Sequence, residues 1–259
     1  MKSFMAGWLG GKSRLAKEIV ARIPEHTCYV EPFAGAAWVL FRKPESSVEV
    51  VNDINADLVN LYRVVQNHLE EFVRHFKWCL VSREEFRRLQ DTPPEVLTDI
   101  QRASRYYYLQ KTSFAGRGRN FGYSAVQPSR LNLLRIEEEL SAAHLRLARV
   151  LVEHLPYAEV IRRYDRPGTF FYIDPPYWGC ENDYGKGIWT REDFNRLAEL
   201  LGGIKGKFLL SLGDNAEVRK LFKTFKIDSV ETFYSCGREG RSKASEVLIS
   251  NYAKEKMKT

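Results

Sequence analysis

One stretch of the sequence decides the fold: Thr169-Phe170-Phe171-Tyr172-Ile173-Asp174-Pro175-Pro176-Tyr177. Residues 169–173 are an apolar, aromatic run that predicts a buried strand. Proline fixes its own φ and pushes the residue before it toward extended geometry, so the residues after the strand predict a rigid ledge. We expect the Asp174 carboxylate and the Pro175 carbonyl (the acceptor pair) to lie close together beside the ring of Tyr177.

The acceptor pair suits a flat heteroaromatic ligand that carries an exocyclic amino group. Such a group donates two hydrogen bonds while its ring stacks on Tyr177, and a nucleobase has both properties. The simpler interpretation is a strand followed by a proline turn, which is a common arrangement.

The bulk composition predicts a globular, cytoplasmic protein. The chain has 259 residues, of which 44% are hydrophobic, enough for a large buried core. It has no apolar run of about 18 residues or more, and its glycine-rich start lacks the apolar centre of a signal peptide. The four cysteines, at positions 28, 79, 180 and 236, form no C-x-x-C pair, and no H-E-x-x-H motif occurs. We therefore expect neither a disulfide framework nor a bound metal.

The charge of the chain favours an acidic partner. The net charge is +7 and the pI is near 9.2. Most of the excess lies between Arg102 and Arg149, where nine basic residues stand against three acidic ones. Within this segment, residues 113–123 (the arginine loop) alternate glycine with arginine and aromatic residues, which suits contacts with phosphates and base edges. A solvated basic loop is the simpler interpretation.

Strand and helix signals alternate at both ends of the chain, whereas the middle is helical and charged. Strands are predicted at 28–31, 48–51, 169–173, 208–212, 230–233 and 247–249. Helices are predicted at 15–23, from 38, from 57 and after the capping pair Thr190 and Asp193. The fold class is therefore α/β, with one sheet built from residues 1–56 and 166–259 and an insertion at 57–165.

Two further features belong to this layout. Phe33-Ala34-Gly35-Ala36-Ala37 lies where a strand turns into a helix, and its small residues let a ligand approach the backbone. Asp53 follows about 20 residues later at the end of the next strand, where doubly wound folds place an acid that accepts hydrogen bonds from ribose hydroxyls. By contrast, Trp8-Leu9-Gly10-Gly11-Lys12-Ser13 fails as a phosphate-binding loop, because that pattern needs glycine where Ala6 stands.

Taken in order, these motifs resemble those of the Dam family of DNA adenine methyltransferases. The resemblance rests on Trp8 with Gly10-Gly11-Lys12, Glu31-Pro32-Phe33-Ala34-Gly35-Ala36, Asn52-Asp53-Ile54-Asn55 and Asp174-Pro175-Pro176-Tyr177, and it extends to residues 208–211 and 246–252. It implies a Rossmann-like sheet that binds S-adenosylmethionine, with a mainly helical, inserted target-recognition region.

The resemblance also implies roles for individual residues. Trp8, Lys12, Asp53 and Asp174 would contact S-adenosylmethionine, and Phe33 and Gly35 would line its pocket. Asp174, Pro175 and Tyr177 would be catalytic, and Lys111, Arg117, Arg119 and Asn120 would contact duplex DNA. The implied activity is site-specific methylation of the N6 amino group of an adenine that is flipped out of the duplex.

The residues themselves explain why this chemistry fits. The lone pair of an adenine amino nitrogen is delocalised into the ring, so acceptors for its two hydrogens favour a more tetrahedral, nucleophilic nitrogen. No covalent nucleophile and no metal ion is required. The acceptor pair would also accept the N4 amino group of cytosine, and a catalytically silent DNA-binding module with the same fold is the alternative from another class.

The chain departs from the family pattern at two places. Ala37 stands where relatives often have a second glycine. Relatives that read GATC carry N-G-L-x-R, whereas this chain has Ala115-Gly116-Arg117-Gly118-Arg119. Arg119 keeps an arginine that can pair bidentately with a guanine edge. The lost amide at Ala115 and the charge at Arg117 leave the recognition sequence open.

Overall fold

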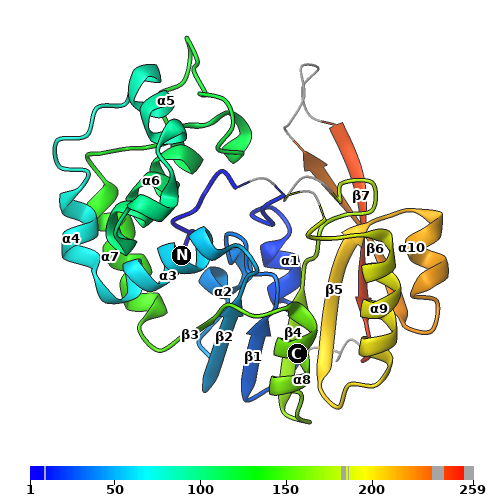
Figure 1. Ribbon diagram of the computed structural model, residues 1–259. Coiled ribbons are helices and arrows are strands. Elements are labelled where there is room, and N and C mark those ends of the chain that lie inside the picture. Colours follow the sequence, from blue (N-terminus) through cyan, green and yellow to red (C-terminus); the bar gives the residue numbers. More distant parts are fainter. Residues whose placement is uncertain (9, 182–184, 186, 235–241, 254–259) are drawn as a thin grey trace. The chain divides into compact units, whose positions relative to one another are not determined.

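The chain forms two compact units in the computed structural model (Figure 1). Unit 1 comprises Met1–Ser13, Gly35–Lys43 and Asp53–His154, and unit 2 comprises Arg14–Ala34, Pro44–Asn52 and Leu155–Thr259. The structure describes residues 1–8, 10–181, 185, 187–234 and 242–253, so Leu9 and Cys236 lie outside the described residues. The predicted division into 1–56 with 166–259 and 57–165 stays a prediction, and the compact units group 1–13 and 35–43 with the middle of the chain.

Strands of unit 2 lie in one sheet in the order β2-β1-β4-β5-β7-β6. Their bounds are β1 Cys28–Glu31, β2 Val48–Asn52, β4 Thr169–Ile173, β5 Lys207–Gly213, β6 Lys226–Tyr234 and β7 Ser242–Ser250. The first four run parallel, and β7 is antiparallel to both β5 and β6. The predicted α/β class is confirmed. β6 and β7 are longer than predicted, because they pair continuously from Lys226 with Ser250 to Tyr234 with Ser242.

The parallel register brings the ends of three strands to one edge of the sheet. Val30 of β1 pairs with Phe171 of β4, and Ile173 of β4 pairs with Leu210 of β5. The segments that follow these strands therefore leave from the same edge, where open α/β sheets bind their ligands. All five residues of β4 are buried, as its continuous apolar run predicts.

The helices of unit 2 are α1 (Ala16–Val20), α8 (Tyr157–Tyr164), α9 (Arg191–Gly202) and α10 (Ala216–Leu221). They bury apolar residues, and α8, α9 and α10 contribute theirs to the core that includes this sheet. α9 begins at the predicted capping box of Thr190 and Asp193, and its Phe194 and Leu197 join the core. α1 is shorter than predicted, because the chain before Pro24 tightens into bonds from Arg22 N to Ile19 O and from Ile23 N to Val20 O.

Unit 1 is mainly helical, as the middle of the sequence predicts. Its elements are α2 (Trp38–Arg42), α3 (Ala56–Asn67), α4 (Leu69–Arg74), α5 (Arg83–Asp91), η1 (Pro94–Val96), α6 (Asp99–Thr112), η2 (Phe114–Gly116), α7 (Ile136–Leu147) and β3 (Leu151–Glu153). The ring of Phe4 lies 5.7 Å from those of Phe41 and Tyr62 and 6.2 Å from that of Tyr107, so the N-terminal segment is part of this core. Among the described helices, none is long and apolar enough to cross a membrane.

Candidate active site

Asp174 is held by a neighbouring strand in unit 2. It directly follows β4, and its Oδ1 accepts a hydrogen bond of 2.9 Å from the Ser211 hydroxyl on β5. The Tyr172 hydroxyl lies 3.0 Å from the same Ser211 oxygen. Ser211 is fully buried and Asp174 is half-buried. The carboxylate is therefore fixed from the side of the core, at the edge of the sheet where ligands bind.

Tyr177 lies beside this carboxylate. Burial raises the pKa of the Tyr177 phenol well above its usual range, and the negative charges of Asp174 and Glu246 add to this rise. The ring approaches Gly213 of β5 so closely that a Cβ there would lie 3.4 Å from the Tyr177 ring. The phenol therefore stays neutral, and its ring is packed against the strand that carries Ser211.

Phe33 and Ala34 are the two residues of the glycine turn (residues 33–37) that belong to unit 2, and Phe33 contributes an aromatic side chain. Its ring stacks on Tyr157 at a centroid distance of 5.3 Å and meets Trp189 edge-on at 5.4 Å. Asn52 fixes the turn, because its side-chain amide donates to the carbonyls of Pro32 at 2.9 Å and Leu155 at 3.0 Å. Sequence reasoning missed Tyr157, which begins α8 after Pro156 and forms no motif of its own.

Asp53 and Gly35 meet in unit 1. The Asp53 carboxylate accepts hydrogen bonds of 2.9 Å from the backbone N–H groups of Gly35 and Asn55. Burial raises the pKa of the Asp53 carboxyl, and these backbone bonds oppose the rise. Gly35 has a φ of +47°, and a Cβ there would lie 3.1 Å from the indole nitrogen of Trp8. Both the left-handed backbone and the close indole favour glycine at this position, and the structure brings the predicted residues Trp8, Gly35 and Asp53 together.

Two neighbours complete this corner of unit 1. The buried ammonium of Lys12 donates to the Gly10 carbonyl at 3.2 Å. Tyr106 of α6 accepts a hydrogen bond of 3.3 Å from Asn55, and its ring lies 6.5 Å from that of Trp8. Sequence reasoning missed Tyr106, because it is the first of three consecutive tyrosines inside a helix and only the folding of α6 brings it to Asn55.

The arginine loop of unit 1 is closed by its own backbone. Phe114 N donates to Asn120 O at 2.7 Å, and Gly122 N donates to Thr112 O at 2.8 Å. The predicted DNA-contact residues Arg117, Arg119 and Asn120 are exposed. The sequence pattern therefore predicted the exposure of these side chains but not the closed backbone that carries them.

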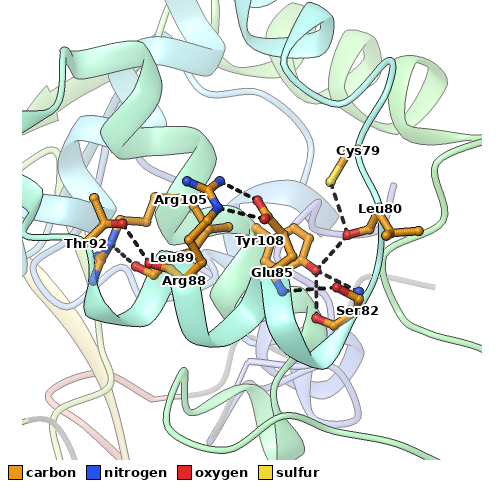
Figure 2. Close-up of polar contacts among 9 residues, drawn as sticks. All are labelled: Cys79, Leu80, Ser82, Glu85, Arg88, Leu89, Thr92, Arg105 and Tyr108. Carbon is orange, nitrogen blue, oxygen red and sulfur yellow. Dashed lines mark hydrogen bonds and ion pairs between the residues drawn. The ribbon is translucent and has the colours of Figure 1, made fainter.

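Hydrogen bonds join α6 to both ends of α5 (Figure 2). Arg105 of α6 donates to the carbonyls of Leu89 at 2.7 Å and Gln90 at 3.2 Å, at the end of α5. Tyr108 of α6 accepts from Ser82 N at 3.1 Å and lies 3.0 Å from Leu80 O, at the start of α5. The Gln90 side chain then donates to the carbonyls of Gly118 at 3.3 Å and Arg119 at 2.9 Å. Arg119 is thus positioned through its main chain.

Lys111 is placed differently from the other predicted DNA contacts. Its side chain is buried, and its ammonium donates to the Phe4 carbonyl at 3.1 Å and lies 5.4 Å from the centre of the Tyr107 ring. Burial lowers the pKa of this amine. Lys111 therefore ties the N-terminal segment to α6 instead of presenting its charge to solvent.

Comparisons with known proteins show which family the chain belongs to. Type II methyltransferase M.CviBI of Paramecium bursaria Chlorella virus NC1A is 27% identical over 95% of this chain and 98% of its own length. Type II methyltransferase M1.LlaDCHI of Lactococcus lactis subsp. cremoris is 25% identical over 95% of this chain and 94% of its own length. A DNA adenine methylase of Escherichia coli (strain K12) is 27% identical over 93% of this chain and 92% of its own length. A family model described as D12 class N6 adenine-specific DNA methyltransferase matches residues 8–236, so the chain belongs to that family.

Proposed function

We propose that this adenine-specific, S-adenosylmethionine-dependent DNA methyltransferase binds the N6 amino group of a flipped-out adenine with the acceptor pair of Asp174 and Pro175. One observation carries the proposal. The hydrogen bond of 2.9 Å from Ser211 fixes the Asp174 carboxylate at the ligand-binding edge of the sheet. A carboxylate that accepts a hydrogen bond there is set up to accept more, and its negative charge favours the positive charge that develops on the methylated nitrogen.

Tyr177 supports the same reaction by stacking. An adenine that has left the duplex loses its neighbours in the stack, at a cost of a few kcal/mol. An aromatic ring held beside the acceptor pair restores part of that stacking energy and orients the amino group toward the two acceptors. The neutral state of the Tyr177 phenol keeps a second negative charge away from the base.

The unit 1 residues around Asp53 fit the cofactor. Asp53 presents carboxylate oxygens next to a glycine turn, an arrangement that accepts hydrogen bonds from ribose hydroxyls. A Cβ at Gly35 would crowd Trp8, so the turn leaves no room for a side chain beside the indole. When bound, S-adenosylmethionine supplies a methyl group on a positively charged sulfur. As the resemblance to the family implies, we propose that Trp8, Lys12, Phe33, Gly35, Asp53 and Asp174 contact it, and the proposed chemistry uses no metal ion.

The arginine loop supports sequence reading in duplex DNA. Arg119 is exposed, and its backbone carbonyl is fixed by Gln90, so its guanidinium can pair bidentately with a guanine edge. Arg117 and Asn120 lie on the same loop and are proposed to contact phosphate and sugar. Phe114 is 68% exposed, which places an aromatic ring where it can stack on bases.

Modified-base sequencing tests the proposal. The chain is expressed in a host without adenine methylation, and its DNA is sequenced for N6-methyladenine and N4-methylcytosine. We expect N6-methyladenine in one sequence context, none with Asp174→Ala, and an unchanged pattern with Glu199→Ala, a matched removal of an exposed carboxylate of unit 2. N4-methylcytosine, or a normal pattern with Asp174→Ala, would refute the proposal.

A further inference from the structure

The Asp174 carboxylate is the end of a buried hydrogen-bond chain whose direction the residue types fix. A carboxylate only accepts, so the single proton of the Ser211 hydroxyl is donated to Asp174 Oδ1. The oxygen of Ser211 can then only accept from Tyr172, which lies 3.0 Å away. The chain therefore runs from the Tyr172 hydroxyl through the Ser211 hydroxyl to Asp174.

Tyr172 is suited to be a permanent donor. Its side chain is 3% exposed and Ser211 is 0% exposed, so the protein interior shields both hydroxyls from bulk water. Burial, together with the negative charges of Asp174, Glu246 and Glu31, raises the pKa of the Tyr172 phenol well above its usual range. The phenol keeps its proton at every pH at which the protein works, and a chain of such bonds is strengthened by mutual polarisation.

The charged surroundings explain why Asp174 needs this donor. Glu246 on β7 and Glu31 at the end of β1 are both 1% exposed. The carboxylate of Glu246 acts on both Tyr172 and Tyr177, as that of Asp174 does, and the carboxylate of Glu31 acts on Tyr172. Like charges favour protonation of one of the carboxyl groups, and a protonated Asp174 would lose its capacity to accept from the substrate amine. A hydrogen bond donated to the carboxylate favours its ionised form and also fixes its rotamer.

We propose that Ser211, with Tyr172 behind it, is a positioning residue that holds Asp174 ionised and oriented as the acceptor for the substrate amino group. This inference rests on the proposed function of Asp174. Neither hydroxyl touches the substrate, so both act mainly on the rate of transfer, and their loss changes substrate and cofactor binding much less. Tyr172 acts only through Ser211, so its removal has no further effect once the Ser211 hydroxyl is gone.

Steady-state kinetics of purified variants on duplex DNA test the positioning role. For Ser211→Ala we expect kcat to fall roughly 10- to 100-fold, the effect of a hydrogen bond to a charged group, with KM for DNA and cofactor changed less than about threefold. The acid limb of the pH profile of kcat moves to higher pH, because Asp174 is protonated more readily once it has lost this donor. The charged and titratable groups around it are Glu246, Glu31, Tyr172 and Tyr177. Tyr172→Phe shows the same pattern with a fall of roughly threefold to tenfold. The double variant equals Ser211→Ala.

Matched controls separate this role from a loss of packing. Ser250→Ala removes another buried serine hydroxyl of the sheet, on β7, and Tyr252→Phe removes a partly buried phenol that donates to the Arg22 carbonyl at 2.9 Å. Both controls keep the pH profile and kcat within about twofold of the unmodified enzyme. If Ser211→Ala fails to fold, Tyr172→Phe alone decides, and an unchanged kcat in that variant refutes the proposal.

The outcomes also distinguish the positioning role of Ser211 from the acceptor role of Asp174. Wild-type kcat and pH profile in Ser211→Ala, with no transfer by Asp174→Ala, would overturn the positioning role and leave the role of Asp174 intact. Undiminished transfer by Asp174→Ala would instead overturn the proposed function. Additive losses in the double variant of Ser211 and Tyr172 would also contradict the proposed chain.

Discussion

Asp174 in unit 2 is held through its side chain, by a buried hydroxyl at 2.9 Å, whereas Arg119 in unit 1 is held through its main chain, by Gln90 at 2.9 Å. The first arrangement fixes the atoms that would react and leaves them little freedom. The second fixes the origin of a long side chain whose end stays exposed. A group that must align with a methyl donor benefits from rigidity, and a group that searches for a base edge benefits from reach.

This difference predicts how each region responds to substitution. Loss of one atom in a buried, fully hydrogen-bonded set leaves its partners unsatisfied and has a large effect. Loss of one main-chain anchor of an exposed loop has a small one, because water replaces the bond and the other contacts remain.

Asp53 of unit 1 is also held through its side-chain carboxylate, by two backbone N–H groups. Among the substitutions considered, its replacement is expected to have the largest effect on cofactor binding. For Asp53→Ala we expect the dissociation constant of S-adenosylmethionine to rise roughly 30- to 150-fold, because hydrogen bonds to a carboxylate contribute about 2–3 kcal/mol. Isothermal titration calorimetry measures this change, with circular dichroism as the check on folding. Asp91→Ala, which removes an exposed carboxylate of α5, is the control. An unchanged affinity in Asp53→Ala would remove Asp53 from the proposed cofactor site.

Replacement of Arg119 tests whether its exposed side chain recognises the DNA sequence. In Arg119→Ala we expect the ratio of affinities for specific and random duplexes to fall roughly 10- to 100-fold, because a bidentate contact contributes about 1–3 kcal/mol of discrimination. Arg117→Ala is the matched control, since loss of a phosphate contact weakens binding to both duplexes alike and lowers the salt slope by about one. The measurement is competition binding at one fixed salt concentration. Equal loss on both duplexes in Arg119→Ala would reassign Arg119 to the phosphate backbone.

Gln90 holds Arg119 only through the backbone carbonyl, so its replacement leaves the Arg119 guanidinium in place. We expect Gln90→Ala to lower discrimination by roughly fivefold, which corresponds to about 1 kcal/mol for the lost anchoring bonds. The same competition assay measures it, with Gln66→Ala as a control, since the Gln66 amide binds the carbonyls of Leu147 and Val150 away from the loop. A loss as large as that of Arg119→Ala would contradict the view that the loop tolerates the removal of one anchor.

Ala37 gives the smallest effect, on stability. It adopts a left-handed backbone with a φ of +46°. This conformation costs a non-glycine residue about 1–2 kcal/mol. We expect Ala37→Gly to raise the free energy of unfolding by about 0.5–1 kcal/mol after the extra entropy of glycine in the unfolded chain is subtracted. Urea denaturation at equilibrium measures the change, and a decrease in stability would show that the Ala37 methyl group contributes more in packing than it costs in strain.

The sequence predicted what depends on neighbouring residues in the chain. The strand at 169–173, the acceptor pair after it and the capping box of α9 are local patterns, and the structure confirms the strand and the cap. The contact of Ser211 with Asp174 depends on the register of β4 and β5, which pairs Ile173 with Leu210 and so brings the next residues together. No local pattern encodes that register.

Lys111 is a second residue whose position depends on a contact that the local sequence does not reveal. The sequence predicted a DNA contact for Lys111, but it does not show which face of α6 is buried. The structure places its ammonium against the Phe4 carbonyl, more than 100 residues away in the chain. The exposure of Arg117, Arg119 and Asn120 was predictable because glycine-rich segments with charged residues do not pack into a core.

Single-turnover transfer by Asp174→Ala measures whether the Asp174 carboxylate accepts the substrate amino group during methyl transfer. Enzyme in excess over a duplex that carries the recognition sequence is mixed with labelled S-adenosylmethionine, and the rate constant of transfer is measured beside the dissociation constant of the same duplex. The rate constant is expected to fall by at least about 1,000-fold, because preorganised groups at a developing charge contribute on this scale, while DNA affinity changes less than about threefold. A rate constant within about tenfold of the unmodified enzyme would contradict the assignment of Asp174 as the acceptor of the amino group.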